Sequence, residues 1–519
     1  MIDPLIATFT ILALAIVVFI WNKIPPAIVA LGVALALFST GVVTFEQTIA
    51  GFGDPIVVYL AGLFVVSEAL DATGVTAWAG QQLTRRVGEK RSAVLIALML
   101  LSAGLTALIS VNGAVAALIP VGVMLATRTK QPPSQMLIPM VFAAHAGSML
   151  TLLGTPINLM VSDLAVEAGG RPFGFFEFAL VGVPLLLGVV LICLFLGPKL
   201  LPWHSSENAP RDLSRHAETL AADYSLEHSE TAVTYETGIT EIVIPPRSQF
   251  LGDHVYPGMR TESGELVVVA IHRQGAALAS ADLRVGDVVL LRGAWESIDR
   301  RVAHPGLVAV DAPDQVRRQA VVLGPRAWFA AAVLVVMVAV LATGVLPPAI
   351  VVMFAGGLLV ATRVITVTQA QRSISLPTLV IVAGMVPLST AIQTSGAADL
   401  IAQALNSWFG GGSPHLLLLG VVLVVLILGQ FISNLATVLI VAPIAVAVAE
   451  TAHISPLPMM MAITVAGAAS FLTPVATAGN LMVQEPGSYR FSDYWRLGLP
   501  CIALFGFVAV LIVPLIWPF

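Results

Sequence analysis

Charge and cysteine are both scarce in this sequence, and each shortage excludes a class of protein. Charged residues make up 11% of the 519 residues and hydrophobic residues 57%, whereas soluble domains carry about 25% charged residues. The mean hydropathy is +0.93, so the composition predicts a polytopic membrane protein. The two cysteines, Cys193 and Cys501, fall in apolar runs, which argues against a structural disulfide or a cysteine metal site.

The sequence also lacks the marks of a signal peptide and of an enzyme. The first apolar run, from Leu5 to about Trp21, has no basic region before it and no small-residue cleavage site, so we expect a retained span. We find no motif for a nucleophile, a metal cluster or a phosphate-binding loop. We therefore expect no enzymatic activity, no cofactor and no nucleic-acid partner, with the lipid bilayer as the surroundings.

The apolar segments form two sets on either side of a polar stretch. The expected segments are 5–22, 25–43, 54–73, 92–110 paired with 112–126, 135–168 and 176–197, then 327–343, 347–362, 377–395, 414–432 paired with 435–450, 456–484 and 497–517. We interpret each close pair as a re-entrant hairpin that returns to the side it came from.

Positive charge is confined to one side of these segments. Of the 25 lysine and arginine residues, only Arg171 then faces the other side. The positive-inside rule makes the crowded side cytoplasmic. This predicts a multi-pass protein of the inner (plasma) membrane, with the polar stretch in the cytoplasm and both termini outside. Hairpins that cross the bilayer fully would give the same sidedness, so charge leaves that choice open.

Matching motifs 322 residues apart indicate that the membrane part is built twice. The stretch "SMLTLLGTPINLMV" begins at Ser148 and "SFLTPVATAGNLMV" at Ser470, and "IPPAIV" at Ile24 matches "LPPAIV" at Leu346. Each half holds five crossings, an odd number, so the second half enters the membrane inverted. Inverted repeats with paired broken helices are typical of secondary transporters, whose binding site lies at the midplane.

The polar middle of the chain predicts a separate small domain. We divide the chain into repeat 1 (1–200), a polar linker (201–236), a small domain (237–301), a second linker (302–324) and repeat 2 (325–519). The runs "EIVIP", "GELVVVAIHR" and "GDVVLLRG" lie between Gly, Pro and Asp turns and predict strands. The predicted fold is therefore an all-α polytopic membrane protein, an inverted repeat of five crossings plus one re-entrant hairpin per half, with a small α+β cytoplasmic domain inserted between the halves.

The small domain also resembles a known module. Its motifs "GITEIVIPPRSQFLG", "VVVAIHRQG" and "LRVGDVVLLRG" are similar to the TrkA C-terminal (RCK-C) domain, a ligand-sensing or dimerising module attached to many transporters and channels. The resemblance implies a small-molecule or ion effector at this domain.

Helix breakers inside the repeated motif predict two unwound points in the membrane. A broken helix is tolerated in lipid only where the freed backbone faces protein or water. Its exposed N–H groups favour anions and its exposed carbonyls favour cations. The predicted points of one shared site are Gly154-Thr155-Pro156 and Ala476-Thr477-Ala478, with Thr155, Asn158, Thr477 and Asn480 as the nearest side chains. A proline kink packed by serine and threonine is the alternative, which the duplication disfavours.

Titratable side chains are few in the expected spans, and no lysine or arginine is predicted deep in the membrane. An anionic substrate would therefore depend on helix dipoles, amides and bound cations. Glu68 and Asp71 fall near the cytoplasmic end of the third segment, where we favour a solvated position. His145 lies nine residues before Gly154. It could relay a proton, but we favour a hydrogen-bonded packing residue.

The tips of the paired segments complete a family resemblance. They read Ser110-Val111-Asn112 and Ser433-Asn434-Leu435, and the breaks read "GTPIN" and "ATAGN". With these motifs both membrane halves resemble the divalent anion:sodium symporter family (DASS), citrate transporter-like permeases of the ion transporter superfamily. The resemblance implies one sodium ion per half, the coupling ion, bound by tip and break, with the substrate between the halves and a homodimer as the assembly.

The resemblance also implies which residues bind each ligand. The implied sodium ligands are Ser110, Asn112, Gly154, Ser433, Asn434 and Ala476. The implied substrate contacts are Ser110, Asn112, Thr155, Asn158, Ser433, Asn434, Thr477 and Asn480.

The resulting hypothesis is a secondary active transporter that couples sodium to uptake of a small anion, sulfate or a di- or tricarboxylate, by alternating access. Val111 and Leu435 depart from the family's tips and the second break lacks proline, which leaves the substrate open. One alternative is a sodium/proton antiporter or arsenite-type efflux carrier of the same superfamily. Another is an RCK-regulated ion channel, suggested by "TIAGFGDP" at Thr48. A filter needs carbonyls from four copies around one axis and Ala50 interrupts the pattern, so we disfavour it.

Overall fold

The computed structural model describes residues 3–21, 23–86, 90–204, 237–261, 264–302, 306–310, 325–397, 400–401, 403–404, 407, 413–474 and 476–519. Most of the two predicted linkers, 205–236 and 311–324, lies outside the described residues. The chain divides into two compact units. The membrane unit comprises Met1–Ala69, Ala79–Pro210 and Ala332–Phe519, and the sheet unit comprises Leu70–Trp78 and Arg211–Ala331.

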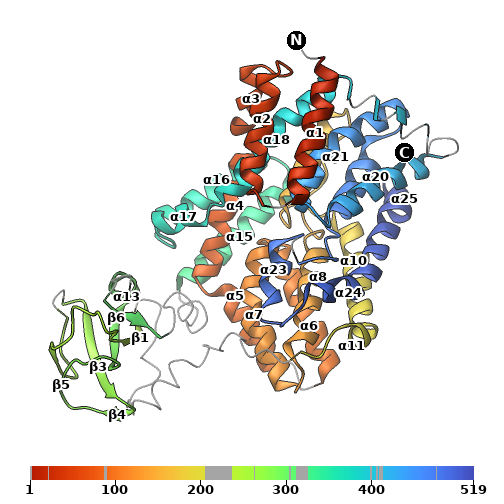
Figure 1. Ribbon diagram of the computed structural model, residues 1–519. Helices are drawn as coiled ribbons and strands as arrows, with labels where there is room; N and C mark the ends of the chain where they lie inside the picture. The colour runs from red at the N-terminus through yellow and green to blue at the C-terminus, as the bar shows by residue number, and fades with distance from the viewer. Residues whose placement is uncertain are drawn as a thin grey trace. The chain divides into compact units, whose positions relative to one another are not determined.

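Helices make up the membrane part of the chain, drawn in red to yellow before the sheet and in green to blue after it (Figure 1). The first set is α1 (Pro4–Trp21), α2 (Pro26–Ser39), α3 (Phe45–Ala50), η1 (Gly51–Gly53), α4 (Pro55–Ala72), α5 (Val75–Arg86), α6 (Arg91–Thr106), α7 (Val111–Arg128), η2 (Pro133–Gln135), α8 (Leu137–Gly147), α9 (Pro156–Glu167), α10 (Ala179–Phe195) and α11 (Gly197–Leu200). The second set is α15 (Pro325–Thr343), α16 (Pro348–Ala361), α17 (Val367–Ser373), α18 (Leu376–Thr394), α20 (Pro414–Leu428), α21 (Asn434–Thr451), α22 (Pro456–Gly467), α23 (Ala478–Gln484), η3 (Phe491–Asp493), α24 (Tyr494–Phe507), the π-helical η4 (Val508–Ile512) and α25 (Val513–Ile516).

Six stretches of helix among the described residues are long and apolar enough to cross a bilayer. They are Pro4–Trp21, Phe45–Ala72, Arg326–Thr343, Leu376–Thr394, Asn434–Thr451 and Phe491–Ile516. Seven shorter apolar helices of 10–17 residues accompany them. The prediction of a mostly helical, polytopic membrane protein is confirmed at this level.

Helix boundaries recur along the chain at the spacing of the sequence motifs. Helix α2 and helix α16 begin and end 322 residues apart, and each has a proline in its first turn, where the missing N–H costs nothing. The short helices α3 and α17 both start with a capping box, Thr44 with Gln47 and Thr366 with Gln369. The same local signals therefore set the same boundaries twice.

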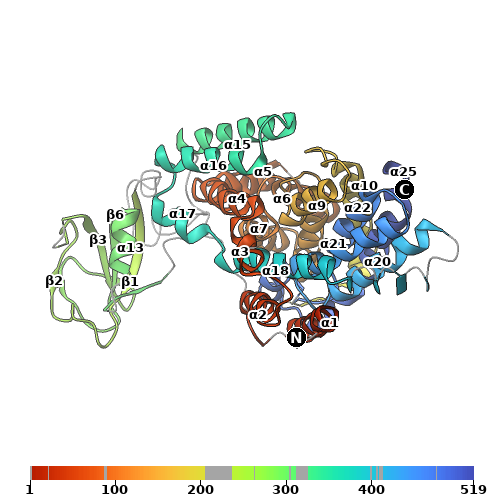
Figure 2. The ribbon, with the colours of Figure 1, turned by 90° about the horizontal axis from the view of Figure 1, so that it is seen from above.

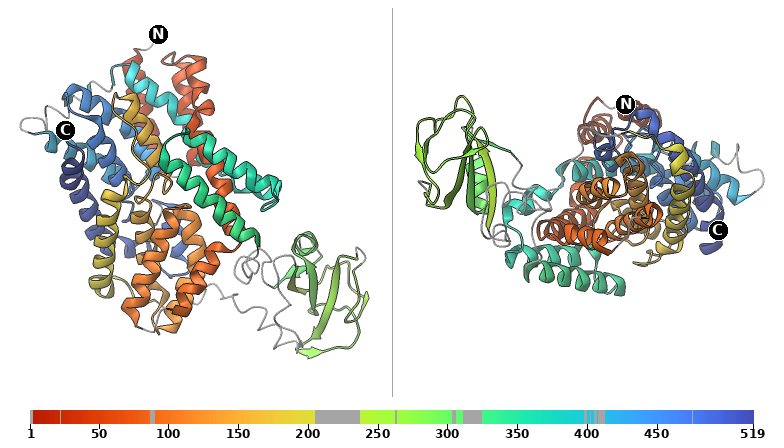
Figure 3. Two further views of the ribbon diagram at one scale, coloured as in Figure 1. Left: turned by 180° about the vertical axis from the view of Figure 1, so that it is seen from behind. Right: turned by 90° about the horizontal axis from the view of Figure 1, so that it is seen from below.

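The two sets of helices pack among one another within the membrane unit. Helix α18 of the second set lies against α2 and α3 of the first (Figure 2). Seen from behind, blue C-terminal segments run among the orange helices (Figure 3), and α23 contacts α7 and α8. Helix α9 in turn contacts α21 and α22. The helix that follows each interruption is thus held by the other set.

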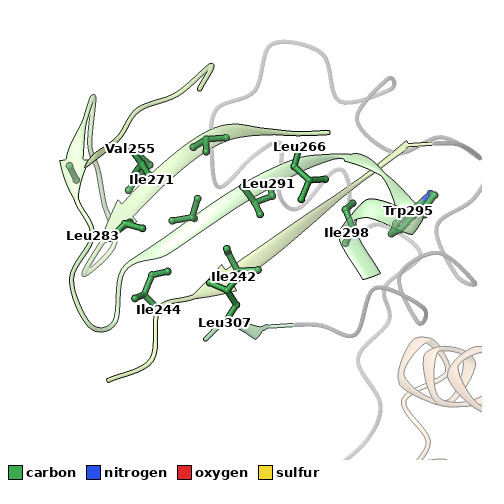
Figure 4. Packing of buried hydrophobic residues seen from close by; sticks show 13 residues of the cluster. Ile242, Ile244, Val255, Leu266, Ile271, Leu283, Leu291, Trp295, Ile298 and Leu307 are labelled. Carbon is green, nitrogen blue, oxygen red and sulfur yellow. The ribbon is translucent and has the colours of Figure 1, made fainter. Parts of the chain in front are cut away.

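The sheet unit holds an antiparallel five-stranded sheet in the order β4-β3-β6-β1-β7. Its strands are β1 (Thr237–Val243), β3 (Leu266–Arg273), β4 (Ala276–Ala277), β6 (Val288–Ala294) and β7 (Val308–Ala309), beside the pair β2 (His254–Val255) and β5 (Ala281–Asp282). Helix α13 (Trp295–Val302) packs on β1 and β6. Figure 4 shows the apolar core between them, with Ile242, Leu266, Leu291 and Ile298 pointing together.

One buried ion pair ties two loops of this sheet. Arg273 at the end of β3 donates from Nε and from a terminal nitrogen to the carboxylate of Asp287, at 2.7 and 2.8 Å. Asp287 is fully buried and also accepts from the backbone N–H of Arg284 at 2.8 Å. The Arg273 guanidinium lowers the pKa of this carboxyl below its ordinary value of 3.8, against the opposing effect of burial.

Candidate functional site

Two helical segments of the membrane unit are interrupted. Helix α8 ends at Gly147 and α9 begins at Pro156, which leaves residues 148–155 as the first break. Helix α22 ends at Gly467 and α23 begins at Ala478, which leaves residues 468–477 as the second break. The predicted interruptions near residues 155 and 476 are confirmed.

In each break, one asparagine donates two hydrogen bonds to backbone carbonyls, and the two breaks match in this respect. In the first turn of α9, Asn158 donates from Nδ2 to the carbonyl oxygens of Ser148 and Thr151, at 2.9 and 2.7 Å. In α23, Asn480 donates from Nδ2 to the carbonyl oxygens of Ser470 and Thr473, at 2.8 and 3.0 Å. Both asparagines are fully buried. Their amides therefore satisfy backbone carbonyls that no helix can satisfy.

Thr155 and Thr477 occupy the N-cap positions of the helices that follow the breaks. Thr477 accepts from the backbone N–H of Asn480 at 3.2 Å, whereas Thr155 makes no capping hydrogen bond. The backbone at Gly154 lies so close to the carbonyl oxygen of Ser148 that a Cβ there would collide with it, so this position requires glycine. Ala476 is buried, with 1% of its surface exposed.

The breaks are tied to the turns of two helical hairpins. Helices α6 and α7 are joined at 107–110, the first hairpin turn, and α20 and α21 at 429–433, the second hairpin turn. Thr151 donates its hydroxyl to the carbonyl oxygen of Ala107. Thr473 donates to the carbonyl oxygen of Gln430 at 2.9 Å, and Ser470 to that of Gly429 at 3.2 Å. Each half thus brings its predicted tip and break together.

The hairpin tips carry the remaining predicted residues. Ser110 caps α7 by accepting from the Gly113 N–H at 3.2 Å, and Ser433 caps α21 by accepting from the Ala436 N–H at 3.4 Å. Asn434 accepts from the N–H of Leu435 through Oδ1, at 2.9 Å. Asn112 is exposed.

His145 lies across the boundary between the two sets of helices. It sits on α8, yet its Nε2 is 3.2 Å from the hydroxyl oxygen of Thr477 and 3.4 Å from Oδ1 of Asn480, both at the second break. Its ring stands edge-on to Phe471, and only 1% of the residue is exposed. The favoured prediction of a hydrogen-bonded packing histidine is confirmed, although its partners lie at the other break.

Two site residues were missed by sequence reasoning. Gln430, buried at 4% exposure, donates to the Ala469 carbonyl oxygen at 2.9 Å and accepts from the Leu472 N–H at 3.0 Å. Tyr494 donates its hydroxyl to the carbonyl oxygen of Asn480 at 2.8 Å. A glutamine in an otherwise apolar run was the available signal for Gln430.

A cavity of about 530 Å³ opens beside the helix that follows the first break. Leu159 and Met160, directly after Asn158, line it. Three carboxylates and several neutral polar side chains complete the lining: Asp54, Asp163, Glu167, Ser389, Thr390 and Gln393. The charged groups of the lining are all acidic, so the cavity attracts cations.

Known proteins with a similar sequence or fold are transporters. The citrate transporter family matches this chain over residues 16–464 and 406–519. The uncharacterized transporter YfbS of Escherichia coli strain K12 is 31% identical, with 99% of each chain covered. Sodium/sulfate cotransporter 1 of Chlamydomonas reinhardtii is 29% identical over 39% of this chain and 24% of its own.

The solved structure of the Alcanivorax borkumensis YdaH transporter has a similar fold, with a TM-score of 0.52 and 15% identity over 97% of this chain and 99% of its own. The family and the relatives are transporters rather than enzymes. The paired breaks therefore lie in a membrane transporter, and the chain belongs to the citrate transporter family.

Proposed function

We propose that the protein couples sodium to the uptake of a small anion, sulfate or a di- or tricarboxylate, by alternating access. The observation that carries the proposal is the pair of breaks, each pinned by one asparagine and tied to its own hairpin turn. In an inverted repeat such paired breaks form one site at the membrane midplane. The hairpins are re-entrant in this arrangement.

The chemistry of the breaks suits an anion together with a cation. Backbone N–H groups at the start of α9 and α23 favour the anion, and freed carbonyls favour the cation. The side-chain oxygen Oδ1 of Asn158 is buried and has no hydrogen-bond partner among the described residues, and amide and carbonyl oxygens are ligands for hard cations. The carboxylates that line the cavity beside α9 would attract a cation toward the first break.

We assign the ligands as follows. The first half-site consists of Ser110, Asn112, Gly154, Thr155 and Asn158, and the second of Ser433, Asn434, Ala476, Thr477 and Asn480. Sodium contacts the tips and the carbonyls at Gly154 and Ala476, and the anion lies between the half-sites. The similarity of part of the chain to a sodium/sulfate cotransporter supports this ion and this class of anion.

The sheet unit resembles an RCK-C domain by its sequence motifs, and we propose that it regulates transport from the cytoplasm. It holds a cavity of about 300 Å³ with an apolar and charged lining, in which Asp253 lies together with His254, Arg260 and Arg301. The Arg301 guanidinium lies 4.4 Å from the centre of the Phe250 ring. A small molecule or ion bound in this cavity would be the effector. We also propose that the protein assembles as a homodimer.

Uptake into proteoliposomes tests the function. Labelled sulfate, succinate and citrate are offered with and without an inward sodium gradient, with a potassium gradient as the control. We expect sodium-dependent accumulation of at least one anion. No accumulation of any, together with sodium-driven proton movement that requires His145 or Glu68, would replace the symporter with the antiporter.

A further inference from the structure

The cavity of the sheet unit has a wall that is mostly apolar. Ile242 on β1, Val268 on β3 and Leu291 on β6 line it, and the strand register places their side chains on one face of the sheet. Figure 4 shows Ile242 and Leu291 within the apolar core. The volume of about 300 Å³ lies at the lower end of the range for small-molecule sites. A ligand that fills this cavity therefore needs a small apolar body.

Four titratable side chains also line the cavity, and they differ in exposure. Asp253, His254 and Arg260 are exposed, so water screens their charges. The Nδ1 atom of His254 is also engaged, 2.8 Å from the carboxylate of Asp282. Arg301 is half-buried, so its guanidinium is the charge that the cavity shields most from water.

The Arg301 guanidinium has a donor without an acceptor. Its Nε atom is buried and has no hydrogen-bond partner among the described residues, while the group lies 4.4 Å from the centre of the Phe250 ring. A buried donor left unpaired costs free energy, and more so when it is charged. A guanidinium has five donors and no acceptor, so the missing partner must be an acceptor, and an anion forms the strongest bond.

Two other arginines of the sheet unit have the partner that Arg301 lacks. Arg273 donates from Nε and from a terminal nitrogen to the carboxylate of Asp287, at 2.7 and 2.8 Å. Arg300, the neighbour of Arg301, lies 3.1 Å from the carboxylate of Glu265. Arg301 lines a cavity instead, so a ligand can supply its carboxylate.

We propose that this cavity binds a small amphipathic monocarboxylate, whose carboxylate accepts from Arg301 and whose apolar body rests on the sheet. A carboxylate matches the guanidinium fork with two parallel hydrogen bonds. Arg260 and Asp253 offset one another in charge, so the lining leaves one positive charge unmatched. A dianion or trianion, such as sulfate, succinate or citrate, would place uncompensated charge against an apolar wall. The inference rests on the proposed function only for its consequence, that the ligand regulates transport.

The experiment measures binding of labelled phenylacetate to the purified, full-length protein in lipid nanodiscs by equilibrium dialysis, with empty nanodiscs as the blank. We expect saturable binding. Unlabelled phenethyl alcohol and phenethylamine carry the same ring without the negative charge. Each should compete at least about tenfold more weakly than unlabelled phenylacetate, which corresponds to the loss of one charge-assisted hydrogen bond.

Two variants of neighbouring arginines locate the site. Arg301→Met keeps an apolar stem beside Phe250 and should lower the affinity for phenylacetate by the same factor. Arg300→Met is the matched control and should leave the affinity unchanged. Equal competition by the alcohol or the amine, no saturable binding of phenylacetate, or unchanged affinity in Arg301→Met overturns the inference. If Arg301→Met does not fold, the competition on the wild type decides alone.

Uptake into proteoliposomes separates regulation from binding. Phenylacetate added on both sides of the membrane should change sodium-driven anion uptake by the wild type and not by Arg301→Met. Wild-type uptake that is unaffected by bound phenylacetate overturns the regulatory consequence. Absence of any sodium-driven uptake overturns the proposed function, and the binding result stands independently of it.

Discussion

Replacing Asn158 by alanine measures how much its hydrogen bonds to the first break contribute to the free energy of unfolding. The change removes the two hydrogen bonds from Nδ2 to the carbonyls of Ser148 and Thr151. Each such bond contributes about 0.5–1.5 kcal/mol net, so the loss is about 1–3 kcal/mol of unfolding free energy. The same change also deletes a buried side-chain oxygen that has no hydrogen-bond partner in the part of the chain that the structure describes, which places the expected loss in the lower part of that range.

The assay is unfolding by sodium-free denaturing detergent in mixed micelles, so that ion binding does not contribute. Asn112→Ala is the matched control, because Asn112 is exposed and its loss is expected to stay within about 0.5 kcal/mol. Equal stability of Asn158→Ala and Asn112→Ala would refute the assignment of Asn158 as the residue that holds the break.

Three further changes have defined outcomes. Gly154→Ala places a Cβ against the Ser148 carbonyl oxygen, so we expect uptake to fall at least tenfold with the protein still membrane-inserted; wild-type uptake would contradict the close approach. Gln430→Leu removes the acceptor of the partly buried Leu472 N–H and one of the two donors to the Ala469 carbonyl oxygen, which keeps the Phe471 N–H. We expect a loss of about 1–3 kcal/mol for the N–H left unpaired, measured by the same unfolding assay; a loss below about 0.5 kcal/mol, roughly the size of a neutral surface change, would contradict it. Asp287→Asn tests the ion pair with Arg273. Because the folded pKa of Asp287 is lowered, its stabilisation is present above the unfolded pKa and is lost as pH falls below about 4. Hydrogen exchange of β6, corrected for intrinsic rates, should show this acid loss in the wild type and not in the variant.

Local signals in the sequence were sufficient to predict the breaks. Asn158 and Asn480 follow the interruptions by a fixed number of residues, and proline or a capping threonine marks where each helix restarts. Strand β3 falls within its predicted run, and β1 and β6 overlap theirs, although β1 begins four residues earlier at Thr237 and β6 ends one residue later at Ala294. These features depend on neighbouring residues, so a single sequence contains them.

Contacts between distant segments were not predictable in the same way. His145 lies close in sequence to the first break but bonds to Thr477 and Asn480, because α8 packs against α23. Gln430 and Tyr494 likewise act on backbone groups of the second break. Such partners depend on how the two sets of helices interdigitate, and the repeat in the sequence carries no information on that packing.

The central claim is that both breaks form one transport site. Sodium-driven anion uptake by Asn158→Ala and by Asn480→Ala, each reconstituted at wild-type density, tests it most directly. A shared site predicts that either variant abolishes uptake, since the anion needs both half-sites. Sodium-driven uptake at the wild-type rate in either variant would contradict the claim.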